Sequence, residues 1–139
     1  MNPFQSLNDY EEFIYTLSLR FASIQHSTLI VVRRGRRTAV LQGEIGFVDG
    51  YRISVKERLT LDAGEVVIED YGYEMWHSAE KIAWYDSQPH PDDPMLASNH
   101  PHHKHVHPDI KHHRIPAPQM SFTSPNLVAL IEEVEQLLV

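Results

Sequence analysis

The chain has 139 residues, 42% of them hydrophobic, and a formal net charge of −7 with its ten histidines counted as neutral. This length is typical of one domain, so we expect residues 1–139 to form a single domain. The absence of cysteine excludes disulfides, thiolate zinc sites and a cysteine nucleophile. The negative net charge also argues against a general nucleic-acid binder.

Neither end of the sequence predicts membrane contact. The first residues lack the basic flank and apolar run of a signal peptide. No apolar stretch approaches the ~18 residues typical of a membrane span. We therefore expect a soluble, cytoplasmic protein.

The first element is an amphipathic helix. Ser6 or Asn8 can cap its start, and acidic residues follow where the helix dipole favours them. Apolar residues then recur at helical spacing, namely Tyr10, Phe13, Ile14, Leu17 and Phe21. The pattern predicts a helix over residues 8–21.

Five strands follow the helix. The content of β-branched residues and the alternation of apolar with polar residues place these strands at residues 28–34, 38–48, 52–59, 66–77 and 82–86. Asp49-Gly50 is typical of a hairpin turn, because both residues accept a positive φ. Glu57 lies on the apolar face of its strand, where a buried carboxylate needs a partner. Arginines of neighbouring strands are the expected partners.

The pattern then changes. Residues 89–118 hold seven of the nine prolines and most of the histidines, which predicts a long loop without regular structure. Ser124-Pro125 begins a final helix, and its apolar stripe is Leu127, Leu130, Ile131, Val134 and Leu138. The predicted fold is α+β: a five-stranded, curled antiparallel meander flanked by an N-terminal and a C-terminal helix, with a His/Pro-rich loop before the last helix.

The histidine-rich loop is the first candidate site, and metal binding is one interpretation. Neutral imidazole binds zinc or nickel, and residues two apart in an extended segment point the same way. Asp86, His90, His103 and His105 are the candidate ligands. The spacing matches no specific metal motif, so we favour no cofactor, with Zn or Ni as the alternative.

Proton transfer is the favoured interpretation. RNA cleavage needs a base, an acid and a cation near the phosphorane, and histidine serves either proton role near neutral pH. The candidate catalytic residues are His90, His102, His103 and His105, with Asp86 to orient an imidazole and Tyr71, Tyr73 or Tyr85 as partners from the sheet. Lys104 and the cluster Arg33, Arg34, Arg36 and Arg37 are the candidate phosphate-binding residues. A solvated loop without a function is the alternative for most of these histidines.

Several segments resemble the TumE-like family, small proteins described as toxins of bacterial and archaeal toxin–antitoxin pairs. The resemblance covers roughly residues 37–138. Its segments are Tyr71-Gly72-Tyr73, Ile82 through His90, Pro101-His102-His103-Lys104-His105, and Pro125 through Leu137. Three positions depart from the family pattern: Trp84 replaces a frequent arginine, Ser87 an asparagine, and Pro91 a second histidine. If that arginine binds phosphate in the family, another cation must do so here.

The resemblance implies a toxin neutralised by an antitoxin. We expect an antitoxin of the helix-turn-helix type, RNA as the substrate of a small endoribonuclease that works without metal, and homo-oligomer formation as a further option. A metal-dependent nuclease and a non-catalytic metal-binding or interaction module are the alternatives.

Overall fold

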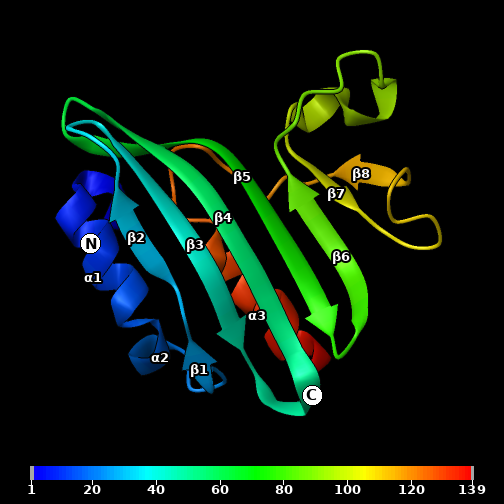
Figure 1. Ribbon diagram of the computed structural model, residues 1–139. Helices are drawn as coiled ribbons and strands as arrows, with labels where there is room; N and C mark the ends of the chain where they lie inside the picture. The colour runs from blue at the N-terminus through cyan, green and yellow to red at the C-terminus, as the bar shows by residue number, and fades with distance from the viewer. Residues whose placement is uncertain (1, 139) are drawn as a thin grey trace.

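The frame of the molecule is one curled antiparallel sheet that does not close into a barrel (Figure 1). The computed structural model describes residues 2–138, and these form eight strands in the order β1-β3-β4-β5-β6-β7-β8, with β2 also paired with β3. Their bounds are β1 (His26–Ser27), β2 (Ile30–Arg33), β3 (Thr38–Gly46), β4 (Tyr51–Asp62), β5 (Glu65–His77), β6 (Glu80–Asp86), β7 (His103–His105) and β8 (Arg114–Pro116).

The predicted class, α+β with a curled antiparallel sheet, is confirmed, but the prediction of five strands is wrong. Strands β2 to β6 match the five predicted segments. The other three are β1, with two residues, and β7 and β8, with three each. The high proline density of this segment excludes a long strand but not a short one. The three residues of β7 contain no proline. Pro116 lies on the edge strand β8, where its missing N–H interrupts no pairing with a further strand.

The predicted N-terminal helix is two helices. They are α1 (Leu7–Tyr15), capped by the Ser6 side chain, and α2 (Leu17–Arg20). The chain departs from helical geometry at Thr16, whose hydroxyl donates to the Glu12 carbonyl over 2.6 Å, a local bond that competes with helix continuation. The last helix, α3 (Leu127–Leu137), matches the predicted stripe. Short 3-10 turns lie at Pro3–Gln5, Val48–Gly50 and Pro94–Asn99.

The predicted Asp49-Gly50 turn can be checked at the backbone. Asp49 and Gly50 join β3 to β4 with φ values of 60° and 79°. Both are positive, as the hairpin interpretation of Asp-Gly requires.

Both long helices pack on the same face of the sheet, here called the helix face. Figure 1 shows α3 behind the central strands and α1 beside β2. From α1, the Tyr10 hydroxyl reaches Glu57 of β4, and the side chain of Asn126, at the start of α3, reaches Tyr73 of β5. The core lies between, and it includes Leu41, Ile53, Met75, Leu130 and Ile131. The opposite side is here called the open face, and no long helix formed by residues 2–138 covers it.

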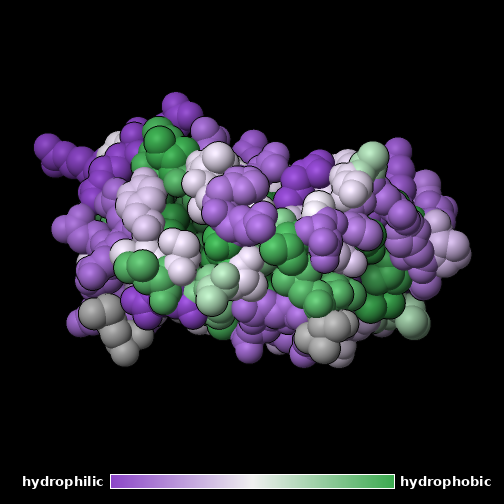
Figure 2. All heavy atoms as spheres, turned by 90° about the horizontal axis from the view of Figure 1, so that it is seen from below, coloured by the Kyte–Doolittle hydropathy of each residue, from purple (hydrophilic) through white to green (hydrophobic). Residues whose placement is uncertain are grey.

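The surface seen from below Figure 1 is mixed. Hydrophobic side chains stand there in separate groups between hydrophilic ones (Figure 2). Among residues 2–138, no helix has the length and apolar character needed to cross a membrane.

Candidate functional site

The candidate site begins where β6 ends on the open face. Asp86 is the last residue of β6 and lies opposite His103 of β7, while Trp84 lies opposite His105. Side chains alternate between the two faces along a strand. Asp86, His103 and His105 therefore share the open face, as the two-residue spacing predicts.

The three side chains form a close group, here called the Asp–His group. The Nε2 atom of His103 is 2.8 Å from Oδ1 of Asp86, and Nε2 of His105 is 3.3 Å from Oδ2. The two Nε2 atoms are 3.1 Å apart. Asp86 also accepts from the Gln88 backbone N–H over 3.0 Å.

The opposite ring nitrogens fix the orientation of both imidazoles. Nδ1 of His103 donates to the Pro101 carbonyl over 3.0 Å, and Nδ1 of His105 donates to the Ile110 carbonyl over 2.9 Å. A carbonyl only accepts, so both Nδ1 atoms carry their proton. Each neutral ring then turns a lone pair on Nε2 toward Asp86.

The Asp–His group is buried, and burial competes with charge in setting its pKa values. Burial lowers the pKa of His103, but the hydrogen bond and charge of Asp86 outweigh it, so the net pKa is raised. Burial also lowers the pKa of His105, and there the net shift is downward. Burial raises the pKa of Asp86, but hydrogen bonds from His103 and Gln88 lower it to below its ordinary value.

A second hydrogen-bonded pair consists of Tyr71 on β5 and His102, the residue just before β7. The Tyr71 hydroxyl and Nδ1 of His102 are hydrogen bonded over 2.7 Å, and both residues are buried. Burial lowers the pKa of His102 and raises that of Tyr71. His102 is therefore neutral near pH 7 and can accept a proton.

An open hollow of about 770 Å³ lies beside these groups, and Asp86 and Tyr71 are the members of the two groups that line it. Gly72 forms its floor, with Lys56 opposite it on β4 and Asp86 opposite it on β6. A Cβ added at Gly72 would meet no atom within 4 Å, so the missing side chain creates the space. Tyr71, Trp84 and Phe122 line the same hollow.

Cations and acids both surround the hollow. The acids Glu69 and Asp70 line it and both pair with Arg58, over 3.5 Å and 2.7 Å. The Trp84 ring stacks on His105 with 4.1 Å between centroids. Lys56, an exposed lysine, and Asp86 lie on either side of Gly72 in the strand register.

Three residues of this site were not predicted: Lys56, Gly72 and Arg114. Arg114 lies opposite His105 in the register of β7 and β8, and the buried Nε of Arg114 has no hydrogen-bond partner within residues 2–138. The sequence held one signal for the hollow. A glycine inside an alternating strand indicates an open or closely approached backbone position.

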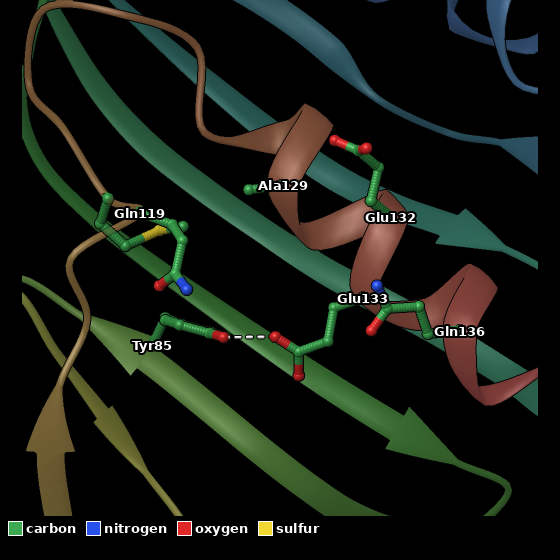
Figure 3. A pocket seen from close by; sticks show the side chains of 7 residues that line it. Tyr85, Gln119, Ala129, Glu132, Glu133 and Gln136 are labelled. Atoms are coloured by element: carbon green, nitrogen blue, oxygen red, sulfur yellow. Dashed lines mark hydrogen bonds between the residues drawn. The ribbon is translucent and has the colours of Figure 1, made fainter.

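Two predicted tyrosines and Lys104 lie on the helix face, turned away from Asp86. Figure 3 shows Tyr85 pointing toward α3, where its hydroxyl donates to Glu133. The Lys104 ammonium donates to the same carboxylate over 2.9 Å. Tyr73 donates to the buried Glu57. The two contacts of Glu133 connect α3 with β6 and β7, and the contact of Tyr73 connects β5 with β4.

The remaining candidates lie outside the Asp–His group. The His90 ring packs edge-on against His103, with 4.9 Å between centroids, but its nitrogens are not among the converging atoms. The arginine cluster lies at the turn between β2 and β3, and Arg33 binds Asn8 and Glu11. Within residues 2–138, none of these four arginines is among the residues that line the hollow. The structure does not bring this cluster to the hollow, and its phosphate role stays a prediction.

The fold and the site define a small α+β protein with a histidine–aspartate centre on the open face of its sheet. The chain belongs to the family described as Toxin TumE, which matches residues 13–138 and thus nearly the whole chain. The resemblance stated from the sequence is confirmed. No curated protein and no solved structure matches the chain.

Proposed function

We propose that this protein is the toxin of a toxin–antitoxin pair and that it cleaves RNA at the hollow over Gly72. Membership of the TumE toxin family supports the toxin function. One observation supports the cleavage: a cation, Lys56, and the Asp–His group stand on opposite sides of one opening whose floor is a glycine. Phosphodiester cleavage needs such a cation and such proton carriers around the phosphate.

The chemistry divides between the two sides of the hollow. The proposed base for the proton of the RNA 2′-hydroxyl is His102, whose pKa burial lowers and whose ring is hydrogen bonded to Tyr71, a residue that lines the hollow. As the 2′ oxygen bonds to phosphorus, the bond from phosphorus to the 5′ oxygen breaks, and that oxygen takes up a proton. The Asp–His group supplies positive charge or a proton on the leaving side, and Lys56 stabilises the phosphorane.

Two further features suit RNA as the substrate. Trp84 lines the hollow and presents a flat ring beside the reacting groups, and base stacking on aromatic rings holds single strands without regard to sequence. Arg114 adds a guanidinium with an unpartnered Nε near His103. Either Lys56 or Arg114 can take the place of the arginine that Trp84 replaces.

The partner in this proposal is an antitoxin protein, which a toxin family implies in general. An antitoxin with a helix-turn-helix domain, and self-association of the toxin, stay predictions. Co-purification with the product of the neighbouring gene would test the first.

The experiment combines growth arrest with RNA degradation by the purified protein. His103→Ala should slow cleavage by about 100-fold or more, the usual contribution of a proton-transfer group. Gly72→Val leaves every reacting side chain in place but puts a branched side chain on the floor of the hollow, between Lys56 and Asp86. It should abolish cleavage and toxicity while the far-UV spectrum stays unchanged.

Thr38→Val is the matched control, because Thr38 is exposed on β3, lies opposite Thr60 and is not among the residues that line the hollow. It should leave both activities intact. If Gly72→Val cleaved RNA as fast as the unmodified chain, the hollow would not be the active site. Toxicity without RNA cleavage would favour a non-catalytic interaction module.

A further inference from the structure

The Asp–His group has the form of a metal site. We propose that Asp86, His103 and His105 bind one divalent transition-metal ion, with zinc or nickel the best match, through one carboxylate and two Nε2 atoms. The same site carries the proposed RNA cleavage, but metal binding can be measured without any RNA.

The arrangement of lone pairs is the first argument. Both Nδ1 atoms donate to backbone carbonyls, so the two Nε2 atoms and the carboxylate face one another as three acceptors. A single proton on His103 satisfies its contact with Asp86 but leaves the 3.3 Å contact between His105 and Asp86 without a hydrogen. One cation at the centre satisfies all three. An Nδ1–H bonded to a carbonyl is also the usual second contact of a metal-binding histidine.

The spacing of the ligand atoms is the second argument. Nε2 of His103 is 2.8 Å from Oδ1 of Asp86, Nε2 of His105 is 3.3 Å from Oδ2 of the same carboxylate, and the two Nε2 atoms are 3.1 Å apart. With metal bonds of about 2.0–2.1 Å, neighbouring ligand atoms lie about 2.9 Å apart in an octahedron and about 3.3 Å apart in a tetrahedron. Each of the three contacts therefore has the length expected between neighbouring ligands of one ion.

Burial and access are the third argument. The His103 side chain is fully buried, and that of Asp86 is 12% exposed and lines the hollow. Three protein ligands with one side open to a cavity are typical of catalytic rather than structural zinc sites. The Trp84 ring stacks on the His105 ring and covers one of its faces. The hollow gives water or a phosphate oxygen a path to the ion from the side of Asp86.

The ligand set also limits which ions bind. Imidazole nitrogen with a single carboxylate favours zinc, nickel, cobalt or copper over magnesium and calcium, which prefer oxygen ligands. The neighbouring Arg114 is a cation, so a bound anion such as phosphate would complete the charge balance.

The test uses the untagged full chain, freed of metal by a chelator and titrated with zinc chloride in a calorimeter. One ion per chain should bind. His105→Ala should weaken its affinity at least tenfold, since even partners that only orient a ligand contribute that much. Asp86→Asn, which keeps the side-chain volume, provides a second variant should His105→Ala fail to fold. A cobalt-loaded sample should show a visible absorption band that both variants lose.

His112→Ala is the control for nonspecific uptake by the histidine-rich segment. His112 is exposed and pairs with Asp109 over 3.1 Å, outside the Asp–His group. It should leave affinity and stoichiometry unchanged. Equal losses in His112→Ala and His105→Ala, or no binding at all, would overturn the metal site. Tight binding without RNA cleavage would instead sustain the metal site and contradict the ribonuclease proposal.

Discussion

Glu57 is a carboxylate enclosed by the core, and its partners differ from those the sequence predicts. It accepts from the Tyr10 hydroxyl over 2.6 Å and from the Tyr73 hydroxyl, and Tyr73 accepts from the Asn126 amide over 3.0 Å. The prediction of arginine partners is wrong, because the strand arginines alternate onto the open face while Glu57 faces the helices. The network connects α1, β4, β5 and the start of α3.

Burial of Glu57 should make stability depend on pH. Burial raises its pKa from 4.5 to about 7, although both tyrosine hydrogen bonds act to lower it. Between these pH values the folded chain holds a proton that the unfolded chain has released, so the free energy of unfolding falls as pH rises. At about 1.4 kcal/mol for each pH unit, the loss is on the order of 3 kcal/mol by pH 7.5.

The Glu57→Gln variant tests this dependence. It cannot ionise, so its free energy of unfolding relative to the unmodified chain should rise by on the order of 3 kcal/mol between pH 4.5 and 7.5. Chemical denaturation at several pH values measures the difference. Glu65 is exposed, so the free energy of unfolding of Glu65→Gln should depend on pH in the same way as that of the unmodified chain. A Glu57→Gln curve that also ran parallel to that of the unmodified chain would show that this carboxyl does not titrate on unfolding.

The two-residue spacing of His103 and His105 predicted that they share a face, because residues two apart in a strand point the same way. Asp86 and His90 were candidates for their place just before the loop, and of these only Asp86 is among the converging residues.

The geometry of the Asp–His group did not follow from spacing. Nothing in the sequence indicates that the carbonyls of Pro101 and Ile110 would orient the two rings, since those contacts depend on the path of the chain around β7. The same limit explains the tyrosines: the Tyr-x-Tyr spacing of Tyr71 and Tyr73 predicts one shared face, but not that only Tyr71 reaches the hollow.

At the scale of elements, α3 is the clearest success of the hydrophobic pattern. The predicted stripe corresponds to the buried residues Leu127, Leu130, Ile131 and Val134. A period of 3.6 is strong over eleven residues. Strands as short as β7 and β8 contain too few residues to show a period of two, and their pairing depends on distant partners, so the sequence could not predict them.

The packing of α3 yields a prediction for two leucines on one helix. Leu130 is fully buried, whereas Leu137 is 45% exposed. Leu130→Ala removes apolar contacts and leaves a cavity, so we expect a loss of about 2–5 kcal/mol in the free energy of unfolding. Leu137→Ala should lose well under half as much, because part of its surface is already in water. Urea denaturation compares the two, and equal losses would mean that α3 is not docked as described.

At the scale of the molecule, the proline-rich segment is part of the sheet rather than an appendage to it. β7 lies between β6 and β8, so both its edges are paired. Its side chains connect to both faces, with Lys104 bound to Glu133 of α3 and His103 bound to Asp86. The candidate site therefore forms only when the whole sheet has formed.

Native-state hydrogen exchange can test whether β7 opens only together with the rest of the sheet. The backbone amides of residues 103–105 should exchange within about tenfold of those in the middle of β5, because both open only by global unfolding. Their exchange should also share the denaturant dependence of β5. Amides at exposed positions of the preceding segment, such as Ala97 and Ser98, serve as the fast reference. If residues 103–105 exchanged as fast as that reference, the segment would open independently of the sheet, and neither the proton-transfer site nor the metal site would be held in place.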